Sequence, residues 1–309
     1  QEKSREHAWS GRLSANTFAK IAHTPDYYSL DFNADFEHKT GTAFSAYQLH
    51  YGQSAQVPHT NEHQLRYTDA PSTKANASFS ANYNYRSDWV SINSTISLRE
   101  AYQKGDRNLY RLDRLGANAP TFGSLPSTTA ALLQTLDAPN SYMASRNTLT
   151  GTFHIRSVIW INKETSNGIR IDPKLEWTND RLSYDRNTLH ATPHRNTVVF
   201  LPSIAWSSEA FRVMYELSYA YPDLQNLLNY VDNSDPLNIY RGNPHLQRST
   251  THRVALSRSW TKWREGKSFA IGADWDVTRN AIAHGQTYDV TTGVRTFSPR
   301  NVDGNWHAA

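Results

Sequence analysis

The chain has 309 residues, a formal net charge of +4 and no cysteine; its mean hydropathy is −0.69, and 12% of its residues are aromatic. The aromatic content argues against disorder, and a hydrophobic fraction of 38% is low for the core of a soluble globule of this size. The lack of cysteine excludes a disulfide framework, cysteine-bound zinc and a thiol nucleophile, and the mild charge, without a run of Lys and Arg, argues against nucleic acid as a partner.

The N-terminal region carries no export signal. No stretch of about 18 apolar residues is present, so we expect no transmembrane helix. The chain also begins with Gln1 rather than Met and has no signal peptide. These absences suit a cytoplasmic protein, and they equally suit a mature protein or a fragment whose N-terminal part is missing.

The main pattern is an alternation of apolar and polar residues with a period of two, which predicts β-strands with one apolar and one polar face. In 74–86, Ala, Phe and Tyr occupy the odd positions from 75 to 85, and polar residues occupy the even ones. The apolar rows cover about 9 to 13 residues, enough to cross a bilayer at a tilt, whereas strands of soluble proteins average about 5 or 6. In chain order, the predicted strands lie at 28–37, 74–86, 90–99, 149–161, 169–178, 197–207, 210–221 and 269–277.

Two prolines fall inside predicted strands. Pro173 lies in 169–178 and Pro202 in 197–207. A closed barrel has no free edge on which to place a residue without an N–H. We therefore expect these prolines at bulges or near strand starts.

Short and long connections alternate along the chain, as in outer-membrane barrels, which have short periplasmic turns and long external loops. The segment 23–26 is the exception, because it reads as short where a long loop is expected. Aromatic residues also gather near strand ends, as in an interfacial belt. The predicted short turns are 38–41, 87–88, 162–168, 207–209 and 262–267, and the predicted long connections are 52–73, 103–147, 187–196, 222–249 and 279 onward.

The segment from Tyr221 to Trp260 resembles a loop of Bacteroidetes-type outer-membrane barrels, the C-terminal parts of TonB-dependent receptors. Its sharpest motif is Gly242-Asn243-Pro244-His245-Leu246, which follows Tyr221-Pro222-Asp223-Leu224 and Asp232-Asn233-Ser234-Asp235-Pro236-Leu237. Weaker matches lie at 136–142 and 288–304. Gln247-Arg248-Ser249 departs from the basic residue, proline and acid that the family usually places there.

The resemblance spans about Tyr28 to Trp306 and implies an antiparallel meander within an outer-membrane barrel of about 22 strands with a plug in its lumen. About 11 strands are predicted here, without a plug or closing strands. We therefore expect residues 1–309 to be a partial barrel domain, about half of a large transmembrane barrel in the outer membrane of a Gram-negative bacterium. By the same resemblance, its partners are outer-membrane lipid, a TonB complex acting through the plug, and an unknown small-molecule, glycan or peptide substrate.

Residues with catalytic chemistry are scattered. His190 and His194 have the spacing of a helical metal site, but Pro193 places them in a loop. Asp31, Asp35 and Glu37 suit a hydrated barrel wall better than acid–base work. No nucleophile elbow, phosphate loop or dinucleotide motif occurs. We predict no enzyme activity, no cofactor and no metal.

The connection 222–249 is the place where a ligand site is expected, if the chain has one. Pro222 ends a strand because it cannot donate to the ladder, and Leu224, Leu227 and Leu228 suggest a short amphipathic turn against the rim. The predicted role of the segment is mainly structural, with a share in ligand capture as the alternative. The candidate ligand-binding residues are Asn233, Asp235, Arg241, Asn243 and His245.

The function predicted from these features is the wall of a TonB-dependent transporter for active uptake of a nutrient or chelate. Alternatives are a surface-exposed or secreted β-rich binding module of the adhesin type, an outer-membrane pore without a plug, and a barrel hydrolase with Ser, His and an acid clustered at one rim. Loops determine specificity in such proteins, and one sequence does not identify the substrate.

Overall fold

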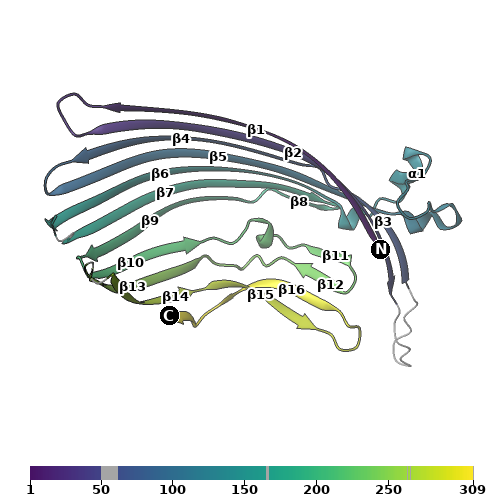
Figure 1. The fold of residues 1–309 in the computed structure, drawn as a ribbon. Coiled ribbons are helices and arrows are strands. Elements are labelled where there is room, and N and C mark those ends of the chain that lie inside the picture. Colours follow the sequence, from purple (N-terminus) through teal and green to yellow (C-terminus); the bar gives the residue numbers. More distant parts are fainter. Residues whose placement is uncertain (50–61, 165–166, 263, 265, 309) are drawn as a thin grey trace.

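The computed structural model describes residues 1–49, 62–164, 167–262, 264 and 266–308. It shows a large curved antiparallel sheet of long strands, with short helical turns and a smaller sheet at one end (Figure 1). The large sheet contains β1 (Glu2–Lys20), β2 (Tyr27–Leu49), β3 (Glu62–Asp69), β4 (Ser72–Arg86), β5 (Val90–Arg111), β6 (Tyr142–Asn162), β7 (Asn167–Arg186), β8 (Leu189–Ala191), β9 (His194–Ser207), β10 (Phe211–Ala220), β13 (Ser249–Lys262), β14 (Lys267–Arg279) and β17 (Asn305–Ala308).

The smaller sheet has the order β11-β12-β16-β15, with β12 and β16 parallel. Among the described residues, no helix is long and apolar enough to cross a membrane. The remaining elements are β11 (Val231–Asp235), β12 (Asn238–Arg241), β15 (Ala281–Tyr288), β16 (Arg295–Val302), η1 (Leu112–Asn118), α1 (Thr129–Gln134), η2 (Ala138–Asn140) and η3 (Gln225–Leu227).

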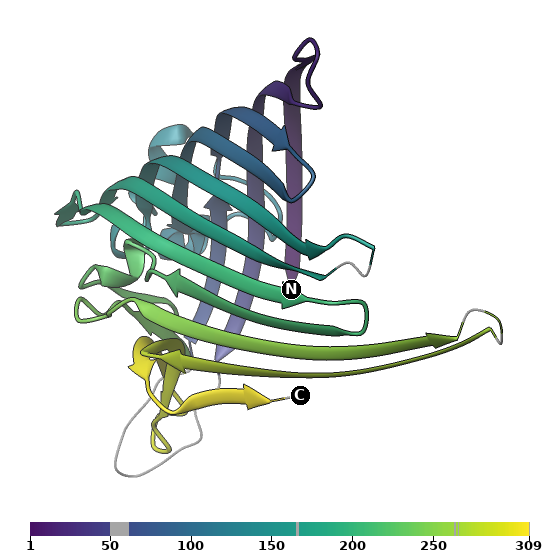
Figure 2. The ribbon, with the colours of Figure 1, turned by 90° about the vertical axis from the view of Figure 1, so that its left-hand side faces the viewer.

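The predicted antiparallel meander is confirmed. Within the described residues, the path β1-β2-β3-β5-β6-β7-β9-β10-β13-β14-β17 passes through 11 strands, while β4 joins β2 to β5 and β8 pairs with β7. β3 and β4 share one register along β2, and only Ala70 and Pro71 separate them. The sheet bends into an open arc, with β1 and β17 as its unpaired edges (Figure 2).

The strands are longer than the alternation predicted. β2 has 23 residues and β5 has 22, which corresponds to roughly 75 Å of strand against about 30 Å of hydrocarbon. The apolar row of β2 runs from Tyr28 to Phe36 and gives way to Thr40 and Thr42. The alternation therefore marks only the part of each strand that contacts lipid, and the strands continue beyond that part.

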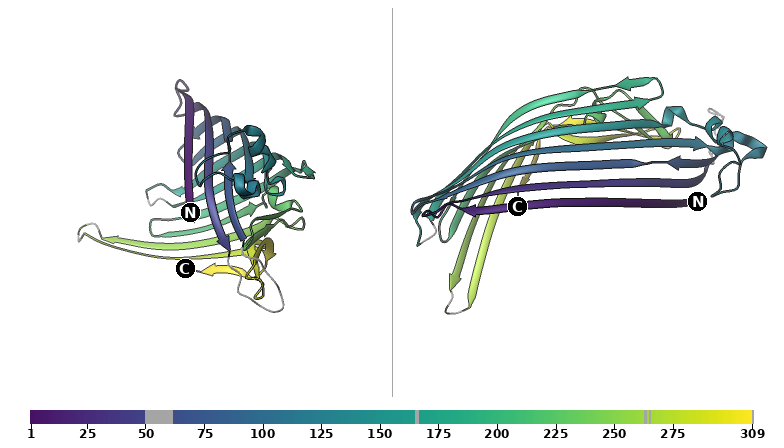
Figure 3. Two further views of the ribbon diagram at one scale, coloured as in Figure 1. Left: turned by 90° about the vertical axis from the view of Figure 1, so that its right-hand side faces the viewer. Right: turned by 90° about the horizontal axis from the view of Figure 1, so that it is seen from above.

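The turn predicted at 38–41 is wrong. These residues lie inside β2 and pair with residues 6–9 of β1, for example Gly41 with Glu6. This error explains the exception in the connection pattern, because removing one false turn makes 21–26 a short turn at the same end as the others. The long connections lie at the opposite end, where α1 projects (Figure 3).

Two predicted long connections are partly strand. Residues 62–69 and 72–73 of the predicted 52–73 loop belong to β3 and β4, and residues 52–61 lie outside the described part. The predicted 103–147 loop shrinks to 112–141, because β5 runs to Arg111 and β6 begins at Tyr142. Polar strands beyond the bilayer resemble loops in sequence, because neither face needs to be continuously apolar there.

Cross-strand register aligns the apolar residues into rows. Phe79 and Phe200 in these rows are 45% and 55% exposed, whereas the polar positions of β4 from Asn76 to Asn84 are half-buried. The more covered polar side chains suit the concave, lumen-facing side of a curved sheet. One apolar row consists of the successive register partners Leu30, Ala81, Ile96, Phe153, Leu175 and Phe200.

The two prolines lie opposite each other, not at bulges or strand starts. Pro173 of β7 pairs in register with Pro202 of β9. Pairing of β7 with β6 is interrupted between Lys174 and Ile171, and pairing of β9 with β10 ends at Ser203. The ladder therefore opens on the far side of each proline, which accommodates the missing N–H groups inside the wall.

Candidate functional site at the external mouth

The inner face of β7 changes character beyond the bilayer. From Arg170 to Glu176 its lumen-facing side chains are charged, whereas Leu182 and Tyr184 on the same face are apolar and 6% and 0% exposed. Residues 221–248, here called the inner loop, cover this apolar patch. Leu224 and Leu228, flanking η3, are 1% and 7% exposed and pack against it. The loop therefore folds onto the lumen side of the wall.

An ionic cluster holds the start of the inner loop. The Arg146 guanidinium donates to both carboxylate oxygens of Asp180, at 2.8 and 2.7 Å, and to Asp223 at 2.5 Å. Arg195 donates to Asp180 at 2.9 Å and to the Pro222 carbonyl at 2.7 Å. The Asp180 side chain is 2% exposed. One buried carboxylate thus orients two arginines, each of which also binds the loop.

A second cluster holds the middle of the loop. Asp232 lies 3.2 Å from Arg186 of β7 and 3.5 Å from Arg107 of β5, and Arg107 also donates to Ser234 Oγ at 3.2 Å. Burial alone would raise the pKa of Asp232, but the Ser234 N–H and Arg186 outweigh burial, so this pKa lies below its usual value. Asp232 is therefore a charged anchor at neutral pH.

The glycine motif closes the loop. A Cβ on Gly242 would stand 1.8 Å from the Leu228 carbonyl oxygen, so no other residue fits. The adjacent Asn243 N–H donates to the Asn226 carbonyl at 2.6 Å, and its side-chain amide donates to the Pro299 carbonyl at 2.9 Å. The motif on which the resemblance depended thus joins the inner loop to itself and to β16.

The five candidate ligand residues divide into two groups. Asp235 accepts from the Leu237 N–H and from Asn238, and Asn243 has the structural bonds just described, so both shape the loop. Asn233, Arg241 and His245 are exposed. None of the five lines the cavity of about 180 Å³ between the loop and the wall; that cavity is lined by Gln103, Gly105, Tyr142, Ala144, Arg146, Leu182, Asp223 and Gln225.

Sequence reasoning missed the wall side of this site. Arg146, Asp180, Arg186 and Arg195 lie in strand extensions that were taken for loops or left unassigned. A signal was present, because the lumen-facing positions of β7 switch from charged to apolar at Leu182. A hydrophobic patch on a face that should meet water indicates a covering element.

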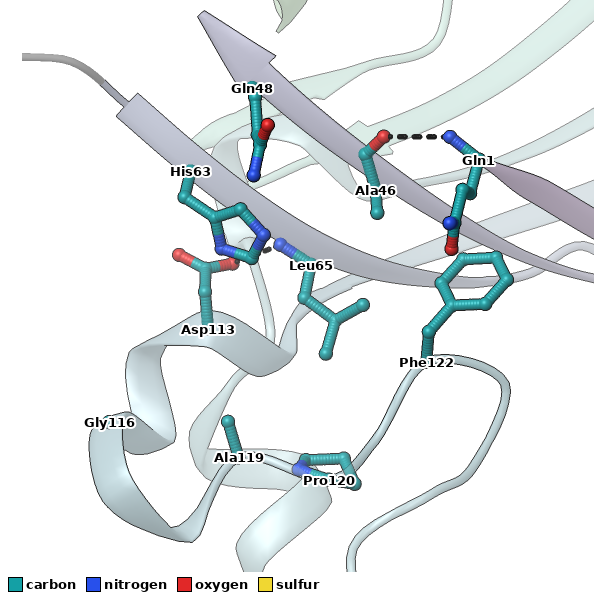
Figure 4. Close-up of a pocket in the computed structure, with 10 residues that line it drawn as sticks. All are labelled: Gln1, Ala46, Gln48, His63, Leu65, Asp113, Gly116, Ala119, Pro120 and Phe122. Atoms are coloured by element: carbon teal, nitrogen blue, oxygen red, sulfur yellow. Dashed lines mark hydrogen bonds between the residues drawn. The ribbon is translucent and has the colours of Figure 1, made fainter.

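A second long connection packs on the opposite face. Residues 112–141, here called the outer loop, cover Leu65, Tyr67 and Tyr110, which continue the outward-facing side of the wall. Asp113 accepts from the Leu65 N–H at 3.1 Å, and both residues line a cavity of about 730 Å³ that is also lined by Phe122 (Figure 4). This cavity lies on the outside of the barrel wall, away from the lumen.

Groups able to bind a metal occur elsewhere. Asp274, Asp276 and His307 on β14 and β17 offer ligand atoms within 4.8 Å of one another, but Arg253 lies 3.6 Å from Asp276 and opposes a cation. His190 pairs with Asp185 at 2.6 Å.

The three predicted wall acids lie on the polar face of β2. Asp31 accepts from Asn82 at 3.2 Å, Asp35 from Asn76 at 2.8 Å, and Glu37 lies 3.2 Å from Lys39. These contacts suit the hydrated wall expected from the sequence.

Comparison with known proteins gives the class. Residues 174–308 match the outer membrane protein beta-barrel family, and no curated protein matches the chain. The fold is similar to that of the ferric citrate transporter FecA in its unliganded form, with 11% identity and a TM-score of 0.50, covering 93% of this chain and 37% of FecA. The chain thus spans well under two thirds of that protein.

Two further structures are similar at lower scores. The Serratia marcescens hemophore receptor HasR, solved with its hemophore HasA and heme, has 11% identity and a TM-score of 0.47, covering 99% of this chain and 50% of that one. The copper transporter OprC has 8% identity and a TM-score of 0.48, covering 97% and 49%.

The chain is therefore a segment of an outer-membrane β-barrel with the fold of the TonB-dependent receptor barrels. Its location is the outer membrane, as the apolar rows predicted. The more specific Bacteroidetes-type assignment stays a prediction.

Proposed function

We propose that residues 1–309 form about half of the wall of a TonB-dependent transporter that takes up a nutrient or chelate. The observation that carries the proposal is the position of the inner loop, which is anchored to the lumen-facing side of the wall through Asp180 and Asp232. A ligand that enters the barrel from outside meets this loop. An adhesin-type module would instead present its loops away from a sheet packed on a core.

The proposal includes three kinds of partner. Outer-membrane lipid covers the apolar rows, and a plug domain occupies the lumen against charged inner positions such as Arg170, Asp172 and Lys174. A TonB complex acts through the plug. The substrate is a small molecule, glycan or peptide, and the exposed Asn233, Arg241 and His245 are the proposed ligand contacts.

The test is growth on, and uptake of, candidate nutrients by cells that express the complete gene product. TonB-dependent transport should stop when the proton gradient is collapsed or when TonB is deleted. Uptake that continues unchanged under both treatments would replace the transporter with a pore without a plug. Normal uptake after deletion of the gene would remove the transport role.

A further inference from the structure

The outward-facing rows of the wall contain almost no charge. On the described parts of β2, β4, β6, β7, β9, β10 and β14, the outward positions of the apolar band hold no Asp, Glu, Lys or Arg. On β5 the exposed Glu100 shares the outward face, in register with Ala77 and Leu149, toward the end that carries the long connections. Arg258 on β13 is the charged residue near the opposite end of the band, because it pairs in register with Phe211 and Ile271 and shares their face. A charged side chain on the lipid face is costly at the bilayer centre and is tolerated near the interface.

Arg258 has aromatic partners and no acidic one among the described residues. Its guanidinium lies 4.3 Å from the ring centre of Trp260 and 5.4 Å from that of Phe211. Trp260 and Phe211 are 40% and 39% exposed, and Arg258 is also exposed. Among the residues that the structure describes, no carboxylate lies within ion-pair distance of it. The charge is thus oriented by two rings and left without an anion.

The position of Arg258 along the strand sets its depth. Phe211 is the first residue of β10, directly after the short turn at 208–210, and the neighbouring Ser259 N–H donates to the Ala210 carbonyl at 2.8 Å. Arg258 therefore lies at the end of the barrel that carries the short turns, which is the periplasmic end in outer-membrane barrels. The β13–β14 hairpin that carries it is the long light-green pair in Figure 2.

The ring centres of Trp206 and Phe211 are 6.4 Å apart, and those of Trp260 and Phe269 are 5.5 Å apart. Arg258 and its two rings therefore belong to an aromatic cluster at this interface. Such rings sit at the level of the lipid headgroups. A guanidinium at this level reaches phosphate oxygens while its stem stays among acyl chains. Its planar, forked donors also match a phosphate in two-point contact.

We propose that Arg258, with Phe211 and Trp260, forms a binding site for the phosphate of a phospholipid headgroup in the periplasmic leaflet. The aromatic rings hold the guanidinium in one orientation, and the phosphate supplies the counter-charge that the described part of the chain does not. The inference depends on the outer-membrane location alone and is independent of the transport proposal.

The experiment is native mass spectrometry of the complete protein purified from outer membranes in detergent, with phosphatidylglycerol added. A basic residue near an anionic lipid surface contributes about 1 kcal/mol, or about fivefold in affinity. Arg258→Gln should therefore retain phosphatidylglycerol about fivefold more weakly. The matched control is Arg212→Gln, because Arg212 lies next to Phe211 at the same depth but on the opposite, lumen-facing side.

Two further measurements protect the test. Trp260→Leu keeps the charge and removes the larger ring, so it should weaken retention less than Arg258→Gln does, and it serves if Arg258→Gln fails to fold. Diacylglycerol, which has the acyl chains without the phosphate, should not be retained at this site. Equal retention by Arg258→Gln and the wild type, equal losses in Arg258→Gln and Arg212→Gln, or full retention of diacylglycerol would each overturn the proposal.

Discussion

The inner and outer loops leave the same end of one sheet and pack on opposite sides of it. The outer loop covers Tyr67 and Tyr110, whose face continues the lipid-facing side. The inner loop covers Leu182 and Tyr184, whose face continues the lumen-facing side. Beyond the bilayer, lipid no longer requires the outer face of the sheet to be apolar, and the lumen no longer requires the inner face to be polar. Each loop therefore docks on the face that carries apolar residues at its position.

The two loops are held by different forces. The outer loop rests mainly on apolar contacts, with Asp113 as a carboxylate anchor between Arg111 and the Leu65 N–H. The inner loop adds two ionic clusters, centred on Asp180 and Asp232. Multiple charged anchors fix direction as well as position, which suits an element that must stay aligned over a lumen.

The largest expected effect concerns Gly242. Gly242→Ala places a Cβ 1.8 Å from the Leu228 carbonyl oxygen, so the inner loop must leave its docked position. We expect a loss of roughly 4 kcal/mol in local stability, at the upper end for one substitution. Hydrogen exchange of inner-loop amides measures this loss. Gly11→Ala is the control, since nothing lies within 4 Å of its Cβ, and protection unchanged by Gly242→Ala would contradict the docked loop.

The next effect tests whether the loops are independent. Leu224 of the inner loop and Leu112 of the outer loop are 1% and 0% exposed. Truncating either to Ala should cost about 3 kcal/mol, because a cavity remains among packed neighbours. Hydrogen exchange should rise in the inner loop alone for Leu224→Ala and in the outer loop alone for Leu112→Ala. Equal exchange in both loops from either variant would show that they form one unit.

A smaller effect is expected at Asp180. Asp180→Asn leaves Arg146 and Arg195 without their shared carboxylate, and we expect a loss of about 2 kcal/mol, less than for a fully buried pair because both arginines are partly exposed. Urea unfolding in lipid vesicles measures it. Asp185→Asn, which removes the exposed pair with His190, should cost less than about 0.5 kcal/mol. Similar costs for the two variants would remove the special role of Asp180.

The smallest effect is acid sensitivity. Asp232 of the inner loop and Asp113 of the outer loop both have a lowered pKa. Burial would raise the pKa of Asp113, but Arg111 and the Leu65 N–H outweigh burial. A depressed folded pKa contributes stability that is complete above the unfolded value of 3.8 and is lost as pH falls through the folded value. Asp232→Asn should reduce acid-induced exchange in the inner loop and leave the part due to Asp180, whose pKa, despite burial, is also lowered by Arg146. Asp113→Asn should abolish acid-induced exchange in the outer loop. Acid sensitivity that is undiminished in both variants would assign it to other groups.

Much of the fold was predictable because lipid imposes a simple rule on sequence. Rows such as 75–85 must be apolar wherever they face acyl chains, so their period and length could be predicted from the sequence. The rule stops at the bilayer surface, and there the errors begin: 38–41 was taken for a turn, and 103–111 was taken for a loop. Pro173 and Pro202 were located in strands correctly, but their mutual pairing depends on register between strands, which no single strand encodes.

The candidate site was predictable only in part. The Gly242-Asn243-Pro244 motif marked the inner loop because steric and turn requirements are local. The wall residues that anchor the inner loop, Arg146, Asp180 and Arg186, come from strands far away in the chain. Nothing local in their sequence indicates that they converge.

The period-two alternation and the order of the connections were sufficient to predict the class of the protein: an antiparallel wall with one face to lipid, short turns at one end and long connections at the other. The packing of distant strands determines that the inner loop turns into the lumen and the outer loop away from it. The same packing places Arg258 between two rings on the lipid face. The physical reason is that periodicity is a property of one strand facing a solvent, whereas docking and cation–aromatic stacking require strands distant in the chain to be brought into register.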